Sequence, residues 1–312
     1  MGTTVKCDKL LKFKGVQKDD IKVIREKLKE QRYRICDYTT GAIYMWTEYY
    51  NYEYCIHKDT LFLKSDDTED KGGVSFAVPI GGLSLDEAMS TLLENAEAMA
   101  LKTLRINGAP RFAAEYIGNK YGVEIIRMEN DGDYLYSAEE LATLKGHKYN
   151  KKRNRVNLFL KTYENYSFEP ITRDNIGEVK KFFEKFKSNQ KESNIFADYE
   201  NNHTQILLDN FWDFELLSGV LYVDGKVGGF TAGEIIDDTL YVHIEKADKD
   251  LEGVYQMINY LFSGEIYRKY GVAYINREED LGDEGLRQAK LSYQPVEILD
   301  KYRIIIDVDG ML

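Results

Sequence analysis

The sequence contains 312 residues, of which 43% are hydrophobic and 30% are charged, and its formal net charge at pH 7 is −11. Aromatic residues make up 13% of the chain, which excludes an intrinsically disordered protein. No apolar run approaches the roughly 18 residues of a membrane-spanning helix, and the first residues lack the apolar core of a secretory signal. We therefore expect a cytoplasmic protein of two domains, at roughly 100–200 residues for each domain.

The sequence lacks the motifs of several large enzyme classes. It has no Walker-type phosphate loop, no GxGxxG turn and no GxSxG nucleophile elbow. Its three cysteines include no CxxC pair and its four histidines have no zinc-binding spacing, so no metal site is expected. The net negative charge also disfavours nonspecific binding to nucleic acid.

The first half of the sequence predicts a helix, then strands, then two further helices. Ile21, Ile24 and Leu28 share one face of a helix expected over residues 19–30. Ser84 and Glu87 have the spacing of a capping box, which predicts the start of a second helix. The other expected elements are strands at 42–46, 53–57, 60–63, 73–79 and 104–107, a helix at 112–121, and a strand pair within 123–136.

The second half predicts a similar order around an antiparallel meander. Asp224-Gly225 is a strong hairpin signal, and a second turn at Asp237-Asp238 leads into a third strand. The expected strands are 168–171, 219–223, 227–236, 240–245, 272–276 and 302–307. Four helices are expected in this half. Two begin after Asn175 and after Gly253, and the other two cover residues 198–211 and 284–293.

This order of elements indicates α/β domains with mixed sheets. Strands joined through helices pair in parallel, whereas the meander is antiparallel, so each half is expected to hold a mixed sheet with helices on its faces. The two halves also match in order, which suggests a duplicated unit. We predict an N-terminal domain at 1–146, a basic interdomain helix at 147–165 and a C-terminal domain at 166–312.

A basic segment, Lys145–Lys161, interrupts the acidic chain with seven cationic residues and no acidic residue. In a helix, four of the cations share one face, while Arg153 falls in the adjoining apolar stripe, where a buried guanidinium needs a partner. The segment either binds phosphates or is a solvated helix face with Arg153 in a structural ion pair. Its candidate substrate-binding residues are Lys148, Lys151, Lys152, Arg153 and Arg155.

The strand at 240–245 carries three polar side chains in register. Strict alternation places Tyr241, His243 and Glu245 on one face of this strand. A histidine beside a carboxylate suits proton transfer near neutral pH, which makes His243 and Glu245 candidate catalytic residues. The alternative is a strand with one solvated face.

A run of charged residues follows the last core strand. Asn276 to Asp280 should emerge at the carboxyl edge of the parallel strands, where open α/β sheets place ligands. The next helix carries two cations one turn apart, which point the same way. Asp283 and Glu284 are also explained by the helix dipole alone. The candidate binding residues here are Arg277, Glu278, Glu279, Asp280, Arg287 and Lys290.

Three segments of the sequence resemble a family of bacterial proteins related to the C-terminal domain of phosphatidylglycerol lysyltransferases. These segments are YLYSAEELATLKGHKYNKKRNRVNLFLK, HIEKADKDLEGVYQMIN and INREEDLGDEGLRQAKLSYQP. The resemblance implies two tandem GNAT-like acyltransferase domains, similar to Fem-type aminoacyltransferases. Its motif positions include Lys148, Lys152, Arg153, Asn154, Glu278, Glu279, Asp280, Arg287, Lys290 and Tyr293. It further implies transfer of an aminoacyl group from a charged tRNA to an amine or hydroxyl of a small molecule, peptide or lipid headgroup.

The sequence departs from the relatives at two places. Lipid-modifying lysyltransferases carry a membrane-spanning N-terminal region, which this sequence lacks. Acetyl-CoA enzymes of this fold have a glycine-rich pyrophosphate loop, where this chain has four acids within residues 245–254; these would repel a pyrophosphate.

We place the transfer site in the second domain, between the strands at 240–245 and 272–276. Glu245 or His243 is expected to accept the proton, and Asn276 or Tyr293 to stabilise the oxyanion. The basic helix would hold the donor phosphates. No obligatory cofactor is expected, and aminoacyl-tRNA or acyl-CoA is the candidate co-substrate. The alternatives are an acetyl-CoA-dependent N-acetyltransferase and a non-catalytic anion-binding protein.

Overall fold

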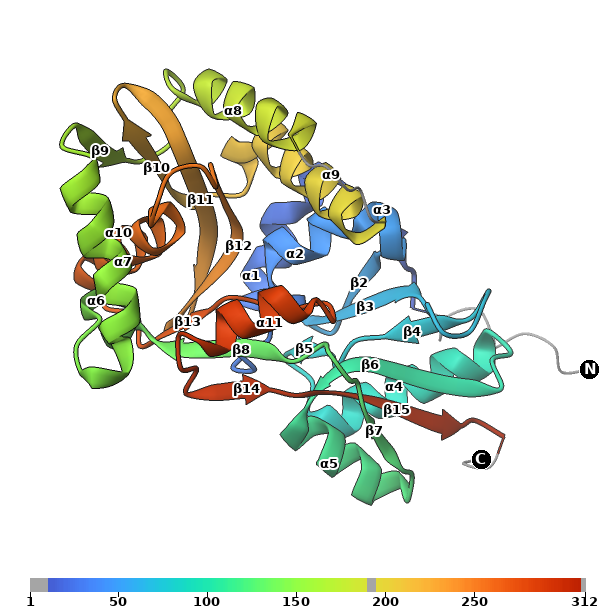
Figure 1. Ribbon diagram of the computed structural model, residues 1–312. Coiled ribbons are helices and arrows are strands. Elements are labelled where there is room, and N and C mark those ends of the chain that lie inside the picture. The colour runs from blue at the N-terminus through green and yellow to red at the C-terminus, as the bar shows by residue number, and fades with distance from the viewer. Residues whose placement is uncertain (1–10, 190–194, 310–312) are drawn as a thin grey trace, which may run out of the picture. The chain divides into compact units, whose positions relative to one another are not determined.

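The computed structural model describes residues 11–189 and 195–309, which belong to two compact units (Figure 1). Unit 1 comprises the chain up to Gly132 and again from Leu299 onward, and unit 2 comprises Asp133–Ile298. This division differs from the predicted boundaries near residues 146 and 166. Strand β8 (Asp133–Ser137) joins the sheet of unit 2, and the last strand, β15 (Lys301–Asp307), joins the sheet of unit 1.

Unit 1 is built on a mixed sheet in the order β1-β2-β3-β4-β6-β15-β7, with β5 paired to β3. Strands β4 and β6 run parallel, and the crossover connection between them contains helix α4. The strands are β1 (Lys14–Gly15), β2 (Glu53–His57), β3 (Thr60–Asp66), β4 (Val74–Phe76), β5 (Ile80–Gly81), β6 (Thr103–Pro110) and β7 (Ile125–Arg127). The helices are α1 (Ile21–Leu28), α2 (Thr40–Met45), α3 (Thr47–Tyr50), α4 (Leu85–Ala98) and α5 (Arg111–Tyr121).

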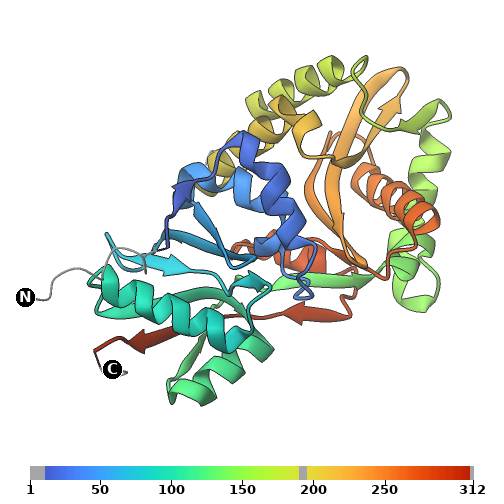
Figure 2. The ribbon, with the colours of Figure 1, turned by 180° about the vertical axis from the view of Figure 1, so that it is seen from behind.

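Side-chain caps begin two helices of unit 1, α2 and α4. Ser84 and Glu87 form the predicted capping box at the start of α4, which packs with α5 on the sheet (Figure 2). The prediction of a strand at 42–46 was wrong, because Thr39 caps helix α2 by accepting a hydrogen bond from the Ala42 amide. The predicted strand pair within 123–136 was also wrong, since β7 and β8 belong to different sheets.

Unit 2 is built on a second mixed sheet in the order β14-β8-β13-β12-β11-β10-β9. Its strands, besides β8, are β9 (Tyr166–Glu169), β10 (Leu217–Val223), β11 (Lys226–Ile236), β12 (Thr239–Ala247), β13 (Tyr274–Asn276) and β14 (Glu297–Leu299). Its helices are α6 (Ala138–Thr143), α7 (Asn150–Thr162), α8 (Ile176–Ser188), α9 (Ile195–Asp209), α10 (Val254–Tyr270) and α11 (Glu284–Leu291). The predicted antiparallel meander β10-β11-β12 and the parallel pairing of β12 with β13 through α10 are confirmed.

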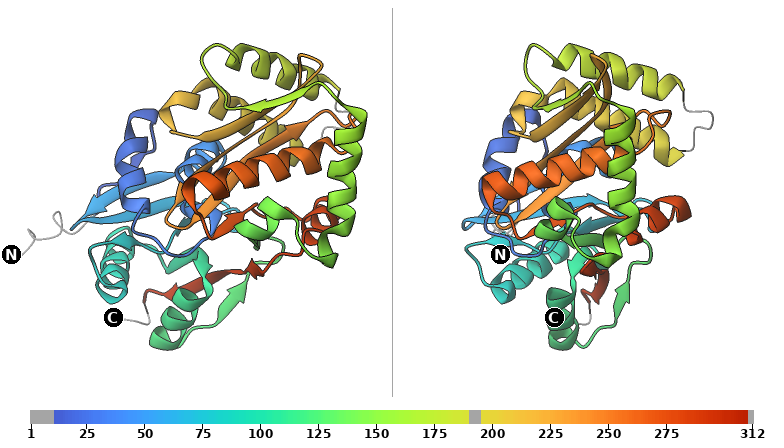
Figure 3. Two further views of the ribbon diagram at one scale, coloured as in Figure 1. Left: turned by 90° about the vertical axis from the view of Figure 1, so that its left-hand side faces the viewer. Right: turned by 60° about the vertical axis from the view of Figure 1, so that its left-hand side comes forward.

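Helices cover both faces of the sheet in unit 2. Helix α8 packs Phe182 and Phe183 against Phe230 of β11, with ring centroids 6.1 Å apart in both pairs. Helix α10 packs on β10, β11 and β12, together with α6 and α7, as Figure 3 shows. Val156 and Phe159 of α7 lie in this same core, so the basic helix is part of unit 2 rather than a separate connector. Within residues 11–189 and 195–309, no helix has the length and apolar character needed to cross a bilayer.

Candidate functional site

Strands β12 and β13 separate at their carboxyl ends. Their pairing stops at Tyr241 and Asn276, where β13 ends, while β12 continues to Ala247. The chain after β13 follows β8 instead, because the Arg277 amide donates to the Tyr134 carbonyl at 3.0 Å. Charged side chains from both diverging segments meet in this region. It is the place between the two strands where the sequence predicted a transfer site.

An ion pair connects the diverging strands. The Arg277 guanidinium, just beyond β13, lies 2.8 Å from Glu245 of β12, and both side chains are only 13% exposed. The guanidinium also lies over the rings of Tyr136 and Tyr293, at 5.9 and 5.0 Å from their centroids. This arrangement fixes a cation between two aromatic rings. The Glu245 carboxylate is thus occupied by Arg277 and is not free to act alone.

Lys152 of helix α7 approaches the same ring. Its Nζ lies 3.8 Å from the Tyr293 centroid and donates to the Ser292 hydroxyl at 2.6 Å. Burial, followed by the neighbouring charge of Arg277, lowers the pKa of Lys152 to about 8, and Glu245 opposes this only in part. A pKa near 8 allows this amine to exchange a proton close to neutral pH.

His243 lies between two carboxylates rather than facing a substrate. Its ring nitrogens are 2.8 Å from Glu278 and 3.0 Å from Glu234, and the side chain is fully buried. Burial by itself would lower the pKa of His243, but hydrogen bonds to both glutamates raise it to about 10. An imidazolium that donates from both nitrogens has no lone pair for a proton, so this geometry argues against His243 as the proton acceptor.

A β-bulge explains the position of His243. The register between β11 and β12 shifts so that Ala232 pairs with Ile244 and Gly233 with Val242, which leaves His243 without an opposite residue. A bulged residue points differently from its neighbours, so the strict alternation predicted for 240–245 is interrupted. The prediction of one solvated face is wrong, because Tyr241 and His243 are buried.

The segment after β13 is held by buried polar contacts. Lys290 Nζ donates to the carbonyls of Arg277, Glu278 and Glu279 at 2.6, 3.2 and 2.5 Å. Asn276 donates through Nδ2 to Asp133 at 2.7 Å and accepts the Glu278 amide at 2.6 Å. The Lys290 ammonium, predicted to contact substrate, is therefore engaged by backbone carbonyls, and the Asn276 amide, predicted to donate to the oxyanion, is engaged by the Asp133 carboxylate.

Asp280 and Arg287 form a second clamp on this segment. Arg287 donates from Nε and Nη2 to the two carboxylate oxygens, both at 2.9 Å, and Tyr134 donates its hydroxyl at 2.6 Å. These bonds, led by those of Arg287, lower the pKa of Asp280 to about 2 despite its burial. Arg287 and Lys290 thus point the same way, as predicted, toward the loop after β13. Glu279 has its carbonyl held by Lys290.

The cations of the basic segment do not form one continuous surface. Lys148 pairs with Glu140 at 2.7 Å, and Arg155 lies 3.9 Å from Glu252. Arg153 donates to the carbonyls of Leu144 and Gly146 and to the Asn150 side chain, so its predicted partner is backbone rather than an acid. Lys152 turns inward, and Lys151 is exposed with no side-chain partner in the described part of the chain.

Sequence reasoning missed three groups of this site. Glu234 lies on β11 and reaches His243 across the bulge, Tyr136 lies on β8, and Ser292 follows α11. The glycine pair Gly228-Gly229 and Gly233 were the available signal for irregular pairing on β11. A side chain built on Gly233 would come within 2.0 Å of the Tyr241 carbonyl, so glycine is required there.

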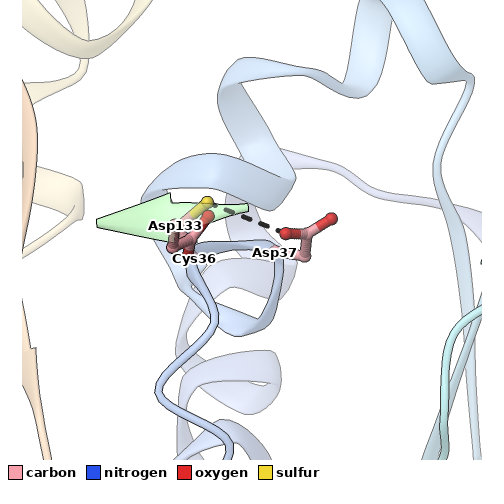
Figure 4. A group of neighbouring side chains, drawn as sticks. All are labelled: Cys36, Asp37 and Asp133. Atoms are coloured by element: carbon pink, nitrogen blue, oxygen red, sulfur yellow. Dashed lines mark hydrogen bonds between the residues drawn. The ribbon is translucent and has the colours of Figure 1, made fainter. Parts of the chain in front are cut away.

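Unit 1 holds a separate cluster of ionisable groups. The Cys36 thiol donates to Asp37 at 3.7 Å (Figure 4), and the buried Lys301 ammonium of β15 contacts both side chains, at 3.5 Å from the Cys36 sulfur. Lys301 thus neutralises Asp37 and ties the last strand to the segment that precedes α2.

Comparisons with known proteins agree with this architecture. The family profile described as "Phosphatidylglycerol lysyltransferase, C-terminal" matches residues 29–305. The uncharacterized protein MYCGA3080 of Mycoplasmoides gallisepticum is 27% identical over 206 residues, and the match spans 65% of each chain. A crystal structure of a conserved protein of unknown function from Bacteroides thetaiotaomicron is 34% identical, with a TM-score of 0.84 over 95% of this chain and 100% of the other.

More distant structures share the fold alone. L-PGS from Bacillus licheniformis has a TM-score of 0.65 at 13% identity, over 94% of this chain and 93% of the other. FemX has a TM-score of 0.62 at 9% identity, over 96% and 98% of the two chains. The mixed α/β fold is therefore shared with L-PGS and FemX, and the chain belongs to the family described as "Phosphatidylglycerol lysyltransferase, C-terminal".

Proposed function

We propose that the protein is an aminoacyl transferase that moves an aminoacyl group from a charged tRNA, or a tRNA-like donor, to an amine or hydroxyl acceptor. The observation that carries this proposal is the separation of β12 and β13, with Lys152 and the Arg277–Glu245 pair gathered around Tyr293 at that point. The family to which the chain belongs is described by a lysyltransferase reaction, which is of this class.

The reaction needs a proton acceptor and a fixed positive charge. The acceptor attacks the acyl carbon, the ester bond to the donor oxygen breaks, and the acceptor proton ends on that oxygen. Lys152 suits the proton exchange, because its pKa of about 8 leaves about a tenth of it neutral at pH 7. Arg277, held by Glu245 and two rings, suits the developing oxyanion, since it is oriented before the reaction.

The remaining predicted residues take supporting roles in this proposal. Tyr293 carries both cations on its ring, and burial raises the pKa of its hydroxyl, which keeps it neutral. The exposed Lys151 and Arg155 on α7 are available for donor phosphates. The acids that precede α10, Asp248 and Asp250 among them, oppose a pyrophosphate, so acetyl-CoA is the less favoured donor.

A transfer assay with the full-length protein tests the proposal. Radiolabelled aminoacyl-tRNAs are supplied with phosphatidylglycerol vesicles or with a peptide that has a free amine, and the label is followed from donor to acceptor. We expect transfer by the wild-type protein and a loss of about 100-fold in kcat/KM for Lys152→Met. Lys161→Met, an exposed lysine at the other end of α7, is the matched control and should retain wild-type activity.

The donor-binding step is measured separately. Replacing Lys151 and Arg155 with glutamate should weaken aminoacyl-tRNA binding and lower the slope of log Kd against log salt concentration by about 2. A protein that transfers no label from any aminoacyl-tRNA, while its fold and tRNA binding are intact, would exclude the proposal. The same transfer assay with acetyl-CoA as the donor tests the alternative function, an acetyltransferase.

A further inference from the structure

The ε-amine of Lys152 has the surroundings of a reactive nucleophile. It is partly buried on α7, beside the fixed guanidinium of Arg277, and it donates to the Ser292 hydroxyl rather than to a carboxylate. The Tyr293 ring at 3.8 Å favours the ammonium form, whereas burial and the nearby like charge favour the neutral amine. Lysines activated in this way are desolvated or lie next to another cation, and Lys152 has both features.

We propose that Lys152 is an acylation site, at which the ε-amine attacks small activated acyl compounds such as acyl phosphates and acyl thioesters. The amine nitrogen forms a bond to the acyl carbon, the bond from that carbon to phosphate oxygen or thiol sulfur breaks, and the leaving group keeps the electron pair. The surplus proton of the amine passes to solvent, and the product is an Nε-acyl lysine. No electron is gained or lost by the protein.

The availability of neutral amine sets the expected selectivity. At pH 7 a lysine with a pKa of about 8 is neutral in about one molecule in ten, against about one in 3,000 for an ordinary lysine. A weaker base is also a weaker nucleophile; with the exponent of about 0.4–0.5 known for thiols, a net advantage of about 20-fold remains. The exposed cations Lys151 and Arg155 on the same helix also attract anionic acyl phosphates.

Acylation would change the charge of the site. The product amide is neutral, so Tyr293 would keep only Arg277 as a cation on its ring, and Lys152 could no longer exchange a proton. If the proposed aminoacyl transfer is correct, the modified protein should be inactive in that reaction. The modification itself does not depend on the proposed function, since it needs only the local chemistry of Lys152.

The test uses acetyl phosphate as the probe and the full-length protein. Site occupancy at each lysine of α7 is measured by peptide mass spectrometry at low conversion between pH 6.5 and pH 10. We expect Lys152 to react at least about tenfold faster than Lys151 at pH 7.5, and the rate at Lys152 to level off above pH 8 to 9. Equal or faster reaction of Lys151 at pH 7.5 would overturn the proposal.

Two substitutions at the neighbouring ion pair give opposite expectations. Arg277→Gln removes the like charge, so the ratio of Lys152 to Lys151 acetylation at pH 7.5 should fall several-fold. Glu245→Gln removes the opposing charge, so the same ratio should rise. A ratio that moves in the same direction in both variants would contradict the electrostatic origin of the reactivity. Partial unfolding would move this ratio toward 1 in both variants, so a rise in Glu245→Gln cannot come from a loss of protein stability.

Discussion

The buried ion cluster of His243, Glu234 and Glu278 should make the stability of the protein fall at alkaline pH. In the folded protein the pKa of His243 is about 10, against an ordinary value of 6.5. Because the folded pKa is raised, the stabilisation is fully present below pH 6.5 and is lost as the pH rises through 10. The full difference of 3.5 pKa units corresponds to about 5 kcal/mol.

The magnitude over an accessible pH range follows from proton binding. Between pH 7 and pH 9 the folded protein keeps the proton on His243 while the unfolded chain has mostly lost it. This group should therefore reduce the free energy of unfolding by about 2 to 3 kcal/mol over those two pH units. This loss of stability comes from the cluster of His243, Glu234 and Glu278, and it adds to the pH dependence that other titrating groups contribute.

The reference protein is the triple variant E234Q/H243Q/E278Q. His243→Gln alone would leave the buried Glu234 and the partly buried Glu278 without their cation, which would distort the comparison. In the triple variant the three side chains are neutral amides of similar size that can hydrogen bond to one another. Groups elsewhere titrate equally in both proteins and cancel in the difference.

Urea unfolding at pH 7, 8 and 9 measures the effect. The wild-type protein should lose about 2 to 3 kcal/mol more than the triple variant between pH 7 and pH 9. NMR of the imidazole, assigned with the His243→Gln spectrum, should place the titration midpoint of His243 above pH 9. Parallel stability curves for the two proteins, or a midpoint near 6.5, would refute the assignment of His243 as a buried cation.

Three further predictions concern the segment after β13 and the start of α10. Asp280→Asn should lower the free energy of unfolding by about 2 kcal/mol at pH 7. The pKa of the Asp280 carboxyl in the folded protein is about 2, so the stabilisation by this carboxylate is lost as the pH falls below 3.8. The effect of the substitution should therefore be about 1 kcal/mol smaller at pH 3. Lys290→Met should lower the free energy of unfolding, measured in urea, by about 2–4 kcal/mol and should speed amide hydrogen exchange at residues 277–283. Unchanged exchange at these residues would contradict the role of Lys290 in holding this segment. Gly253→Ala should lower the free energy of unfolding by about 2 kcal/mol or more, because the φ of Gly253 is +77° and a Cβ there would lie 2.4 Å from the Arg155 carbonyl oxygen. Gly177→Ala on α8 is the control. A Cβ at that position meets no atom within 4 Å, so this substitution should be neutral or stabilising.

Local sequence signals predicted the elements better than their assignment to sheets. The capping box at Ser84 and the Asp224-Gly225 hairpin act over a few residues, and the structure confirms both. The membership of β8 and β15 depends on ladders with strands far away in the chain, such as β15 with β6 across about 200 residues. No local pattern encodes that choice, so the domain boundaries were displaced.

The site shows the same division between local and long-range information. A helical wheel correctly places Lys151 and Lys152 on neighbouring positions of α7, but only the position of Tyr293, more than a hundred residues later, decides that Lys152 turns inward. Alternation along β12 placed His243 and Glu245 on one face, and the bulge at His243 altered that pattern. The charged run after β13 was located correctly, while the partner of each charge required the tertiary structure.

Most charged side chains of this site are paired with an opposite charge or with backbone carbonyls, and Lys152 is the one that we expect to be reactive. His243 is enclosed by two carboxylates, Arg277 is held by Glu245, and the other cations of the loop are bound to Asp280 or to backbone carbonyls. Each of these interactions stabilises one protonation state, and a group held in one state exchanges protons poorly near pH 7. Lys152 differs, because the charge of Arg277 acts on it more strongly than that of Glu245 and its hydrogen-bond partner is a hydroxyl. The chemistry of the site should therefore follow the titration of Lys152, whichever acyl donor binds there.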